Sequence, residues 1–394
     1  MSDQIVIAGA ARTPMGGFQG EFSSLTASEL GGTAIKAALA DAGAKAEQVD
    51  ELLMGNVLPA GQGQAPARQA GFHAGLENSV PASTLNKMCG SGMKTVMLAH
   101  DQLKAGNGDV VVAGGMESMT NAPYLLDKMR SGARLGHANV KDHMFLDGLE
   151  DAYEPGRLMG SFAEDCAEKY QFTRDQQDAY AIRSLEGALA AQKEGRFARE
   201  IAPVKVKTRA GEQVIDSDEQ PRNARPDKIP HLKPAFKKDG TITPANASSI
   251  SDGAAALVLA RQADADRHGF NIRARILGHT SHAQEPAWFS TAPIPAIAKL
   301  LEKVGWSRDD VDLWEINEAF AVVPMAAEKE FSIPREKLNI HGGACALGHP
   351  IGASGARILV TLVNALETHG LKRGVAAICI GGGEGTAMAV ELVD

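Results

Sequence analysis

The sequence predicts an α/β protein made of two similar halves, with a segment of different character inserted into the first. Short apolar runs rich in Val, Ile and Leu alternate with stretches of helical periodicity, which is typical of a parallel sheet covered by helices. The same order of landmarks occurs twice along the 394 residues. Between the two occurrences the regular alternation is lost. Together these observations predict an internally duplicated α/β unit that carries an insertion.

The first half opens with apolar runs that alternate with helical patterns. Buried strands are predicted at residues 5–12 (IVIAGAAR), 50–58 (DELLMGNVL) and 109–118 (DVVVAGGMES). A helix is expected between the first two strands, because Thr26 and Glu29 have the spacing of a capping box and the helical pattern ends at Gly43. Another helix is expected directly after Cys89.

The second half repeats these landmarks in the same order and at nearly the same separations. VDLWEINEA (311–319) corresponds to VDELLMGNV (49–57), the glycine-rich loop and helix at 342–365 to residues 89–103, and AAICIGGGEG (376–385) to VVVAGGMES (110–118). Pro350 is expected at the first position of the helix in this half, where its missing N–H is not needed. The agreement favours a duplication.

The intervening segment differs in composition from both halves. Two helices are expected there, with capping boxes formed by Ser161 with Glu164 and by Thr173 with Gln176. A passage rich in Pro and charge follows, before SISDGAAALVLA (249–260) returns to a strand pattern. We therefore expect residues 1–120 and 248–270 to form the first half, 121–247 an inserted loop domain, and 271–394 the second half.

Composition argues against several classes of protein. The formal net charge of −8 opposes a nucleic-acid or anionic-membrane partner, since both select a basic face. No run of about 18 apolar residues and no secretory signal is recognisable, and the four cysteines lack CxxC spacing. We expect reduced thiols and a cytoplasmic location. Residues 193–239 are locally basic, which fits a solvated surface or a landing site for a phosphorylated ligand.

Cys89 is a candidate nucleophile. It precedes Gly90 and Gly92 at the start of a predicted helix. A helix N-terminus lowers the pKa of a thiol from about 8.5 into the range of about 3.5 to 7.5. Small neighbours also leave room for a bulky thioester. The structural alternative is a small buried apolar residue, a common environment for a free cysteine.

His349, Cys379 and Asn317 are the other candidates for chemistry. His349 could act as a base toward a nearby thiol, and Cys379, which precedes three glycines, could move protons in carbon chemistry. Asn317, followed by Glu318, comes after an apolar strand and could hold a water or a substrate oxygen. The structural alternatives are a histidine satisfied within its loop, a packed cysteine and a strand-to-helix cap.

His341, Cys345 and His349 recur at intervals of four residues, which would suit metal ligands on one helix face. The glycines among them and Pro350 oppose such a helix. We therefore expect no metal site, and packing roles for His341 and Cys345. A dinucleotide site and a P-loop are not expected either, because GGGEGT lacks the spacing of GxGxxG and no GxxxxGK[ST] occurs.

Four motifs, in their order and spacing, resemble the thiolase family. They are NKMCGSG around Cys89, NEAFA at 317–321, GHPIGASGAR at 348–357 and CIGGGEG at 379–385. The likeness covers essentially the whole chain. It implies a fold in which two βαβαβαββ halves stack as five α-β-α-β-α layers, with a loop domain inserted in the first.

The resemblance also implies an activity and a role for each motif residue. The expected enzyme is an acyltransferase, an acetyl-CoA C-acetyltransferase that reversibly condenses two acetyl-CoA molecules into acetoacetyl-CoA and CoA. Cys89 would carry the acyl group, His349 would activate Cys89, and Cys379 would move the α-proton. Asn317, through a water, and His349 would form one oxyanion hole. The backbone amides of Cys89 and Gly381 would form the other.

Coenzyme A is expected as a substrate, with no tightly bound cofactor. The resemblance places ten residues around it: Leu149, Met159, Arg222, Ala235, Phe236, Ser248, Ile250, Phe289, Ala319 and Phe320. The chain departs from the family pattern at Leu158, at Phe289 and in PDKIP (226–230). These departures leave the preferred acyl chain and the binding of the adenine end open.

Other functions stay open at this point. A degradative 3-ketoacyl-CoA thiolase of broad chain length, as in fatty-acid metabolism, would carry the same motifs. A decarboxylating ketoacyl synthase typically uses Cys, His and His, whereas this chain has Asn317 and a second cysteine. A non-catalytic thiolase-like lipid-binding protein would be expected to lack one of Cys89, His349 or Cys379. Family members are dimers or tetramers, the tetramers joined near residues 121–145, so the resemblance implies a homo-oligomer.

Overall fold

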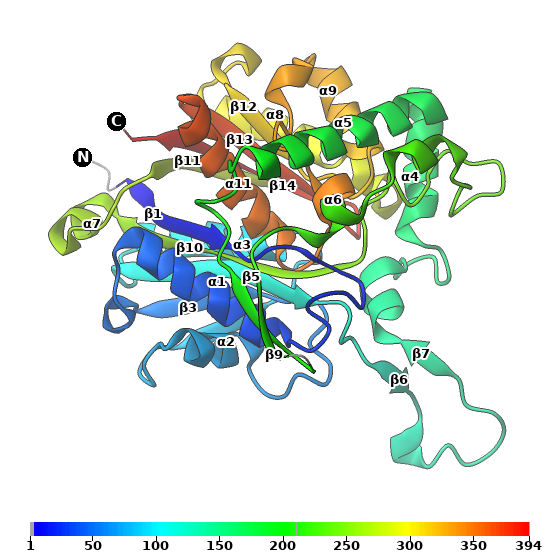
Figure 1. The fold of residues 1–394 in the computed structure, drawn as a ribbon, viewed down its shortest axis with the longest axis horizontal. Helices are drawn as coiled ribbons and strands as arrows, with labels where there is room; N and C mark the ends of the chain where they lie inside the picture. Colours follow the sequence, from blue (N-terminus) through cyan, green and yellow to red (C-terminus); the bar gives the residue numbers. More distant parts are fainter. Residues whose placement is uncertain (1–3, 210, 394) are drawn as a thin grey trace.

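A mixed β-sheet runs through the whole molecule (Figure 1). The computed structural model describes residues 4–209 and 211–393. Within them a ten-stranded sheet has the order β12-β13-β14-β11-β1-β10-β5-β3-β4, with β2 paired to β10 off this path. The strands are β1 (Ile5–Arg12), β2 (Gly16–Gly17), β3 (Glu51–Gly55), β4 (Ala82–Leu85), β5 (Val110–Ser118), β10 (Ser251–Arg261), β11 (Ala274–Ala283), β12 (Leu313–Ile316), β13 (Arg373–Ile380) and β14 (Glu384–Leu392).

The strand pairing confirms the duplication and corrects one expectation. From β1 outward, β10 and β5 are added antiparallel and β3 parallel; from β11 outward, β14 and β13 are added antiparallel and β12 parallel. The two halves join where β1 and β11 pair antiparallel, with Ile5 opposite Ile276. The sheet, which the alternation predicts to be parallel, is therefore mixed. The last strand of each half runs against its neighbours: β14 follows β13 after a tight turn, and β10 follows β5 after the inserted segment.

Helices cover both faces of each half-sheet and produce five layers. Their bounds are α1 (Ala27–Ala42), α2 (Pro66–Ala74), α3 (Ser91–Lys104), α7 (Gln262–His268), α8 (Pro293–Val304), α9 (Val322–Phe331), α10 (Ala344–Leu347) and α11 (Ser354–His369). Val112 of β5 packs in the cluster with α1 and α2, whereas its neighbour Val111 packs in the central cluster with α3 and α11. Both faces are thus buried, which explains the continuous apolar runs of these strands.

The central layer brings α3 and α11 into close approach. A Cβ atom placed on Gly92 of α3 would lie 2.8 Å from the amide nitrogen of Ala356 in α11. A side chain at Gly92 would therefore force the two helices apart. This approach places the loop before α3 and the loop before α11 next to each other, where Cys89 and His349 are found.

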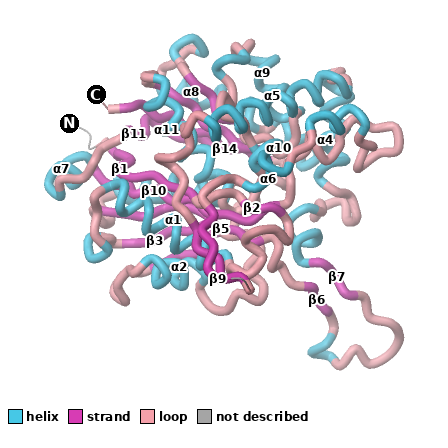
Figure 2. The backbone as a smooth tube through the Cα atoms, in the orientation of Figure 1, coloured by secondary structure: helices cyan, strands magenta, loops and turns pink. Residues whose placement is uncertain are grey.

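The inserted segment, residues 121–247, carries a hairpin that projects from the body (Figure 2). Its elements are β6 (Tyr124–Leu126), β7 (Val140–Asp142), a π-helix η3 (Phe145–Leu149), α4 (Met159–Tyr170), α5 (Arg174–Lys193), β8 (Val204–Thr208), β9 (Gly211–Ile215) and α6 (Glu219–Asn223). Short 3-10 turns are η1 (Ala46–Gln48), η2 (Met129–Ser131), η4 (Pro226–His231), η5 (Pro286–Thr291), η6 (Arg308–Asp310) and η7 (Arg335–Lys337). Among the described helices, none is long and apolar enough to cross a membrane.

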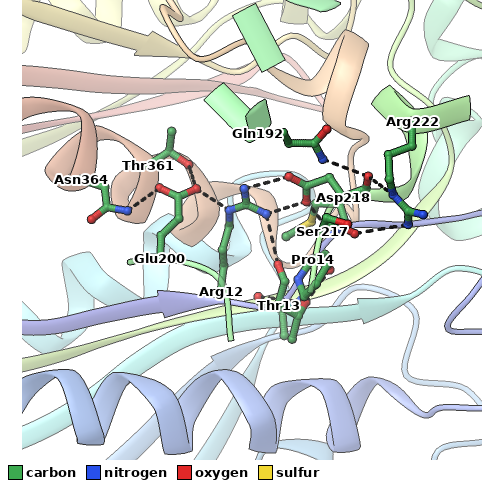
Figure 3. Close-up of polar contacts among 12 residues, drawn as sticks. Arg12, Thr13, Pro14, Gln192, Glu200, Ser217, Asp218, Arg222, Thr361 and Asn364 are labelled. Carbon is green, nitrogen blue, oxygen red and sulfur yellow. Dashed lines mark hydrogen bonds and ion pairs between the residues drawn. The ribbon is translucent and has the colours of Figure 1, made fainter. Parts of the chain in front are cut away.

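A buried ionic network fastens the inserted segment to both halves (Figure 3). Arg12 of β1 donates to Glu200 at 2.6 Å and to Asp218 at 2.6 Å. Glu200 also accepts hydrogen bonds from Thr361 and Asn364 of α11. Burial alone would lower the pKa of Arg12, but the two carboxylates raise it, so the guanidinium stays charged. Removing one charged side chain of this network would leave an uncompensated buried charge.

The helix ends test the sequence predictions directly. The capping boxes of Thr26 in α1 and Thr173 in α5 are both confirmed, and α1 ends at Gly43 in the left-handed conformation. The prediction of a capping box at Ser161 and Glu164 is wrong, because α4 begins at Met159 and Leu158 is its N-cap. The placement of Pro350 in the first turn of a helix is also wrong, because α11 begins only at Ser354.

Candidate active site

An apolar cavity of about 370 Å³ lies where the inserted segment meets both halves. Its walls come from the π-helix, the start of α4 and the loops that precede α3, α9 and α11. The lining residues are Cys89, Phe145, Gly148, Leu149, Leu158, Met159, Gly160, Ala235, Phe236, Pro244, Ala247, Ser248, Ser249, Ile250, Phe289, Ala319, Phe320, His349, Ile351 and Gly381.

Cys89 lies in a sharp turn at the N-terminal end of α3. Met88, the residue before it, has φ of +46°, a strained conformation for a residue with a side chain. The residue is half-buried and lines the cavity, and burial raises the pKa of Cys89 to about 11. Hydrogen bonds from the backbone amides of Gly381 and Cys89 lower this pKa, but by less. The lowered pKa expected from the helix terminus is therefore wrong, because desolvation outweighs the amides.

His349 lines the same cavity and is neutral at physiological pH. Burial lowers its pKa to about 3, and the charge of Arg357 acts in the same direction. Its Nδ1 lies 2.5 Å from the hydroxyl oxygen of Ser354, and that hydroxyl donates its own proton to the carbonyl of Pro350. Nδ1 must then carry the proton, so Nε2 has the free lone pair. No described residue bonds Nε2, which suits a general base.

Cys379 and Asn317 are buried and are not among the residues that line the cavity. Cys379 is near the end of β13, and burial raises its pKa well above the usual value, as does the charge of Cys89. Asn317 follows β12, and its backbone amide donates to the carbonyl of Ala377 at 2.9 Å. Both polar atoms of the Asn317 side chain are buried without a partner among the described residues. An unpartnered buried amide is costly unless a water or ligand contacts it.

Glu117 is a buried carboxylate that the sequence analysis did not single out. It accepts backbone N–H bonds from Val57 at 3.0 Å, Leu58 at 3.1 Å and Gly352 at 2.9 Å. Gly352 belongs to the loop of His349, so this carboxylate joins the end of β5 to that loop. Burial raises the pKa of Glu117 to about 7 despite these bonds. The only signal in the sequence was a charged residue at the end of an apolar strand.

Glu318 performs a similar task in the second half. Its carboxylate accepts hydrogen bonds from Tyr180 at 3.0 Å, Ser184 at 2.7 Å, Asn339 at 2.8 Å and the backbone amide of Cys345 at 3.0 Å. It joins the end of β12 to α5 and to the segment before α11. The residue next to Asn317 therefore holds the surrounding loops in place.

His341, Cys345 and His349 do not converge on a common point. Nε2 of His341 contacts Nε2 of His369 at 3.0 Å, and burial lowers the pKa of His341 to about 4. The thiol of Cys345 points to the carbonyl oxygens of Asn246 and Glu318. Only His349 of the three reaches the cavity. The structure therefore gives these three residues no shared metal site.

The residues expected around CoA are placed unevenly. Nine of the ten line the cavity: Leu149, Met159, Ala235, Phe236, Ser248, Ile250, Phe289, Ala319 and Phe320. Arg222 is not among the lining residues. Its guanidinium instead pairs with Glu21 at 2.6 Å and donates to the carbonyls of Asp218 and Ser217 (Figure 3).

Comparison with known proteins decides the family. The model described as "Thiolase, N-terminal domain" matches residues 5–263, and "Thiolase, C-terminal domain" matches residues 270–392. The chain belongs to the thiolase family. An acetyl-CoA acetyltransferase of Allochromatium vinosum is 47% identical over 99% of this thiolase and 100% of its own length. Acetyl-CoA acetyltransferase 2 of Arabidopsis thaliana is 50% identical over 99% of this chain and 97% of its own.

Solved structures give the same result for the fold. The acetyl-CoA acetyltransferase of Bacillus anthracis superposes with a TM-score of 0.96 at 41% identity, covering 100% of this chain and 99% of that one. The thiolase Acat5 of Ascaris suum, solved in complex with coenzyme A, has a TM-score of 0.93 at 41% identity and covers 99% of this chain and 100% of its own. The predicted thiolase fold is confirmed.

Several residues of this thiolase site were missed from the sequence. Ser354, which fixes the tautomer of His349, is five residues away and carries no periodic signal. Phe145 lines the cavity from a π-helix, an element that is rare and often found at functional sites. Phe145 could be placed from the sequence only within the inserted loop domain, because a helix of five residues gives no measurable helical period.

Proposed function

We propose that this thiolase is an acetyl-CoA C-acetyltransferase, in which Cys89 carries the acetyl group between two molecules of coenzyme A. The observation that carries the proposal is the convergence of two backbone amides, from Gly381 and Cys89, on the sulfur of Cys89. His349 with its free Nε2 lines the same apolar cavity. Donors placed in this way stabilise the oxyanion that forms when a thiol attacks a thioester.

In the first half-reaction, Cys89 attacks the carbonyl carbon of the acyl-CoA. Nε2 of His349 takes the thiol proton and keeps it, while the thiol of Cys379 gives its own proton to the sulfur of the departing CoA and becomes a thiolate. The thiol has a raised pKa and the imidazole a lowered one, so a separated thiolate and imidazolium are disfavoured in the resting enzyme. Proton transfer should therefore accompany bond formation, while the amides of Cys89 and Gly381 hold the oxyanion.

In the second half-reaction, the thiolate of Cys379 removes the α-proton of a new acetyl-CoA and becomes a thiol again. The resulting enolate oxygen would accept a hydrogen bond from the Nε2–H that His349 gained from Cys89 and, through a water, from Asn317, whose side chain has no protein partner among the described residues. The enolate carbon then attacks the thioester carbonyl of Cys89, and the departing Cys89 thiolate takes its proton back from Nε2 of His349. Thiolysis of acetoacetyl-CoA runs through the same steps in reverse.

The substrate in this proposal is coenzyme A with its acyl group, and no resident cofactor is needed. Burial of the pantetheine arm along the apolar wall formed by Phe236, Phe289 and Phe320 would supply affinity. Arg222, which pairs with Glu21, could meet the nucleotide end by exchanging that pairing for a phosphate. A broad-chain-length degradative thiolase remains the alternative, because the cavity lining is almost wholly apolar.

The test is thiolysis of a series of 3-ketoacyl-CoA substrates with increasing chain length. We expect acetoacetyl-CoA plus CoA to yield two acetyl-CoA, with an acetyl adduct on Cys89 visible by mass spectrometry. Turnover should fall sharply beyond four acyl carbons. A flat profile would favour the degradative alternative, and unchanged turnover in Cys89→Ala would refute the proposal altogether.

We also propose that the enzyme is a homo-oligomer, a dimer or a tetramer, working in the cytoplasm. Support for assembly comes from the projecting hairpin, on which Tyr124, Leu126, Leu135 and Val140 are exposed. Exposed apolar side chains gathered on one element are typical of an interaction surface. Support for a reducing compartment comes from the four cysteines, which are all free thiols.

A further inference from the structure

One ion pair links the turn that carries Cys89 to the loop that follows Cys379. Nζ of Lys87 lies 2.5 Å from Oε2 of Glu384. Lys87 is two residues before Cys89, and Glu384 begins β14, directly after the three glycines of the Cys379 motif. The two partners therefore come from different halves of the duplicated fold.

The Cys89 turn is strained but is held from within its own segment. Met88 has φ of +46°, and its amide donates to the side-chain oxygen of Asn86 at 2.9 Å. The hydroxyl of Ser91 accepts from the amide of Lys87 at 2.8 Å and donates to the carbonyl of Met88 at 2.7 Å. These bonds fix the shape of the turn, but none of them fixes its position relative to the other half.

The position relative to the other half matters for the proposed chemistry. The amide of Gly381 hydrogen-bonds the thiol of Cys89, and it contributes to the proposed oxyanion hole only while it stays beside that sulfur, where the acyl oxygen develops its charge. The two loops are closely packed there: a Cβ on Gly90 would lie 2.4 Å from Cδ1 of Ile380. A small relative shift would misalign the Gly381 amide, and losing one such donor typically lowers kcat by about 10² to 10³.

We propose that Lys87 and Glu384 form a clamp between the two halves that positions the Gly381 amide over Cys89. Neither residue lines the cavity, so the clamp acts through the loops and not by contacting substrate. The side chains are 21% and 35% exposed, so the pair should add little to global stability. Its effect should fall on kcat, with KM for acetoacetyl-CoA nearly unchanged. The proposal rests on the proposed thiolase reaction.

The experiment is a double-mutant cycle on the full-length enzyme with a charge exchange. We expect Lys87→Gln and Glu384→Gln each to lower kcat about tenfold, with KM within about twofold of wild type. The Gln/Gln double variant should be no worse than either single variant, because both remove the same interaction. The exchanged pair, Lys87→Glu with Glu384→Lys, should recover most of the activity, as should Lys87→Arg alone.

A matched control is the ion pair of Lys205 and Glu212 on the hairpin of β8 and β9, whose atoms are 3.0 Å apart. Lys205→Gln should leave kcat unchanged. Thermal unfolding should show that all variants are folded, and the rate at which acetyl-CoA acetylates Cys89 should fall in step with kcat.

Three outcomes would overturn the clamp. These are wild-type kcat in both single variants, additive losses in the Gln/Gln variant, and failure of the exchanged pair to recover activity while it remains folded. Failure of the proposed function is distinguishable, because the wild-type enzyme itself would then form no acetyl adduct on Cys89 and would not cleave acetoacetyl-CoA.

Discussion

The reactivity of Cys89 depends on two effects of opposite sign. Its place before a helix predicts a lowered pKa, and the amides of Gly381 and Cys89 do act in that direction. Burial is the larger effect and raises the pKa to about 11. The sequence reveals the helix start but not the depth at which folding encloses the thiol. The residue could be identified from its motif, whereas its protonation state could not.

This difference leads to a prediction for alkylation. Only the thiolate reacts, so the rate at which iodoacetamide modifies Cys89 should rise about tenfold per pH unit between about pH 7 and 9. The sign follows from a pKa raised above that range: each unit of pH multiplies the small thiolate fraction. Peptide mass mapping at several pH values measures the rate at Cys89 alone.

His349→Asn is the control for the alkylation experiment. His349 is already uncharged throughout this pH range, so its replacement should leave the slope unchanged. A rate that levels off above pH 7 would mean that the amides outweigh burial and that the resting enzyme holds a thiolate.

At the scale of single elements, capping boxes illustrate what sequence spacing can and cannot establish. Thr26 and Thr173 have the spacing of a box and form one. Ser161 and Glu164 have the same spacing, yet Ser161 lies inside α4. The carboxylate of Glu164 instead accepts hydrogen bonds from the backbone amides of Thr241 and Ile242, which lie 77 and 78 residues later in the chain. A tertiary contact of this range leaves no local signal.

A matched pair of substitutions tests that distinction. Thr26→Ala should destabilise the first turn of α1 by about 1 kcal/mol, because one backbone amide loses its acceptor. Amide hydrogen exchange there should become about fivefold faster. Ser161→Ala should leave exchange in α4 unchanged or slower, since alanine is the better residue within a helix. Equal acceleration in both helices would contradict the assignment of the α4 start.

At the scale of the whole molecule, the internal repeat could be recognised in the sequence, but the pairing of the two halves could not be predicted from it. Strands such as β1 and β5 could be located from apolar runs, and the duplication from repeated landmarks. The antiparallel direction of β10 and β14 could not be predicted, because a buried strand has the same apolar pattern in either direction. Glu117 with Gly352, and Lys87 with Glu384, join residues more than 200 positions apart, and no spacing rule reaches that far.

The projecting hairpin gives a prediction for assembly. Its exposed apolar side chains include Leu126, 44% exposed, and Val140, 63% exposed, which pair across the two strands. Replacing both with Asp puts like charges opposite each other and removes apolar surface, so an interface built on the hairpin should dissociate. We expect the mass measured by light scattering to fall from that of a tetramer to that of a dimer.

Two further measurements complete this test of the hairpin. Lys141→Ala on β7 is the control, because Lys141 pairs only loosely with Asp127 at the surface, and its mass should match that of wild type. Acetylation of Cys89 should persist in the Asp variant, since the clamp, the His349 loop and the Glu117 carboxylate all lie in the two halves. An unchanged mass in the Asp variant would show that the hairpin does not hold the oligomer together. Loss of acetylation along with mass would mean that assembly helps to shape the cavity wall at the adjoining π-helix, Phe145–Leu149.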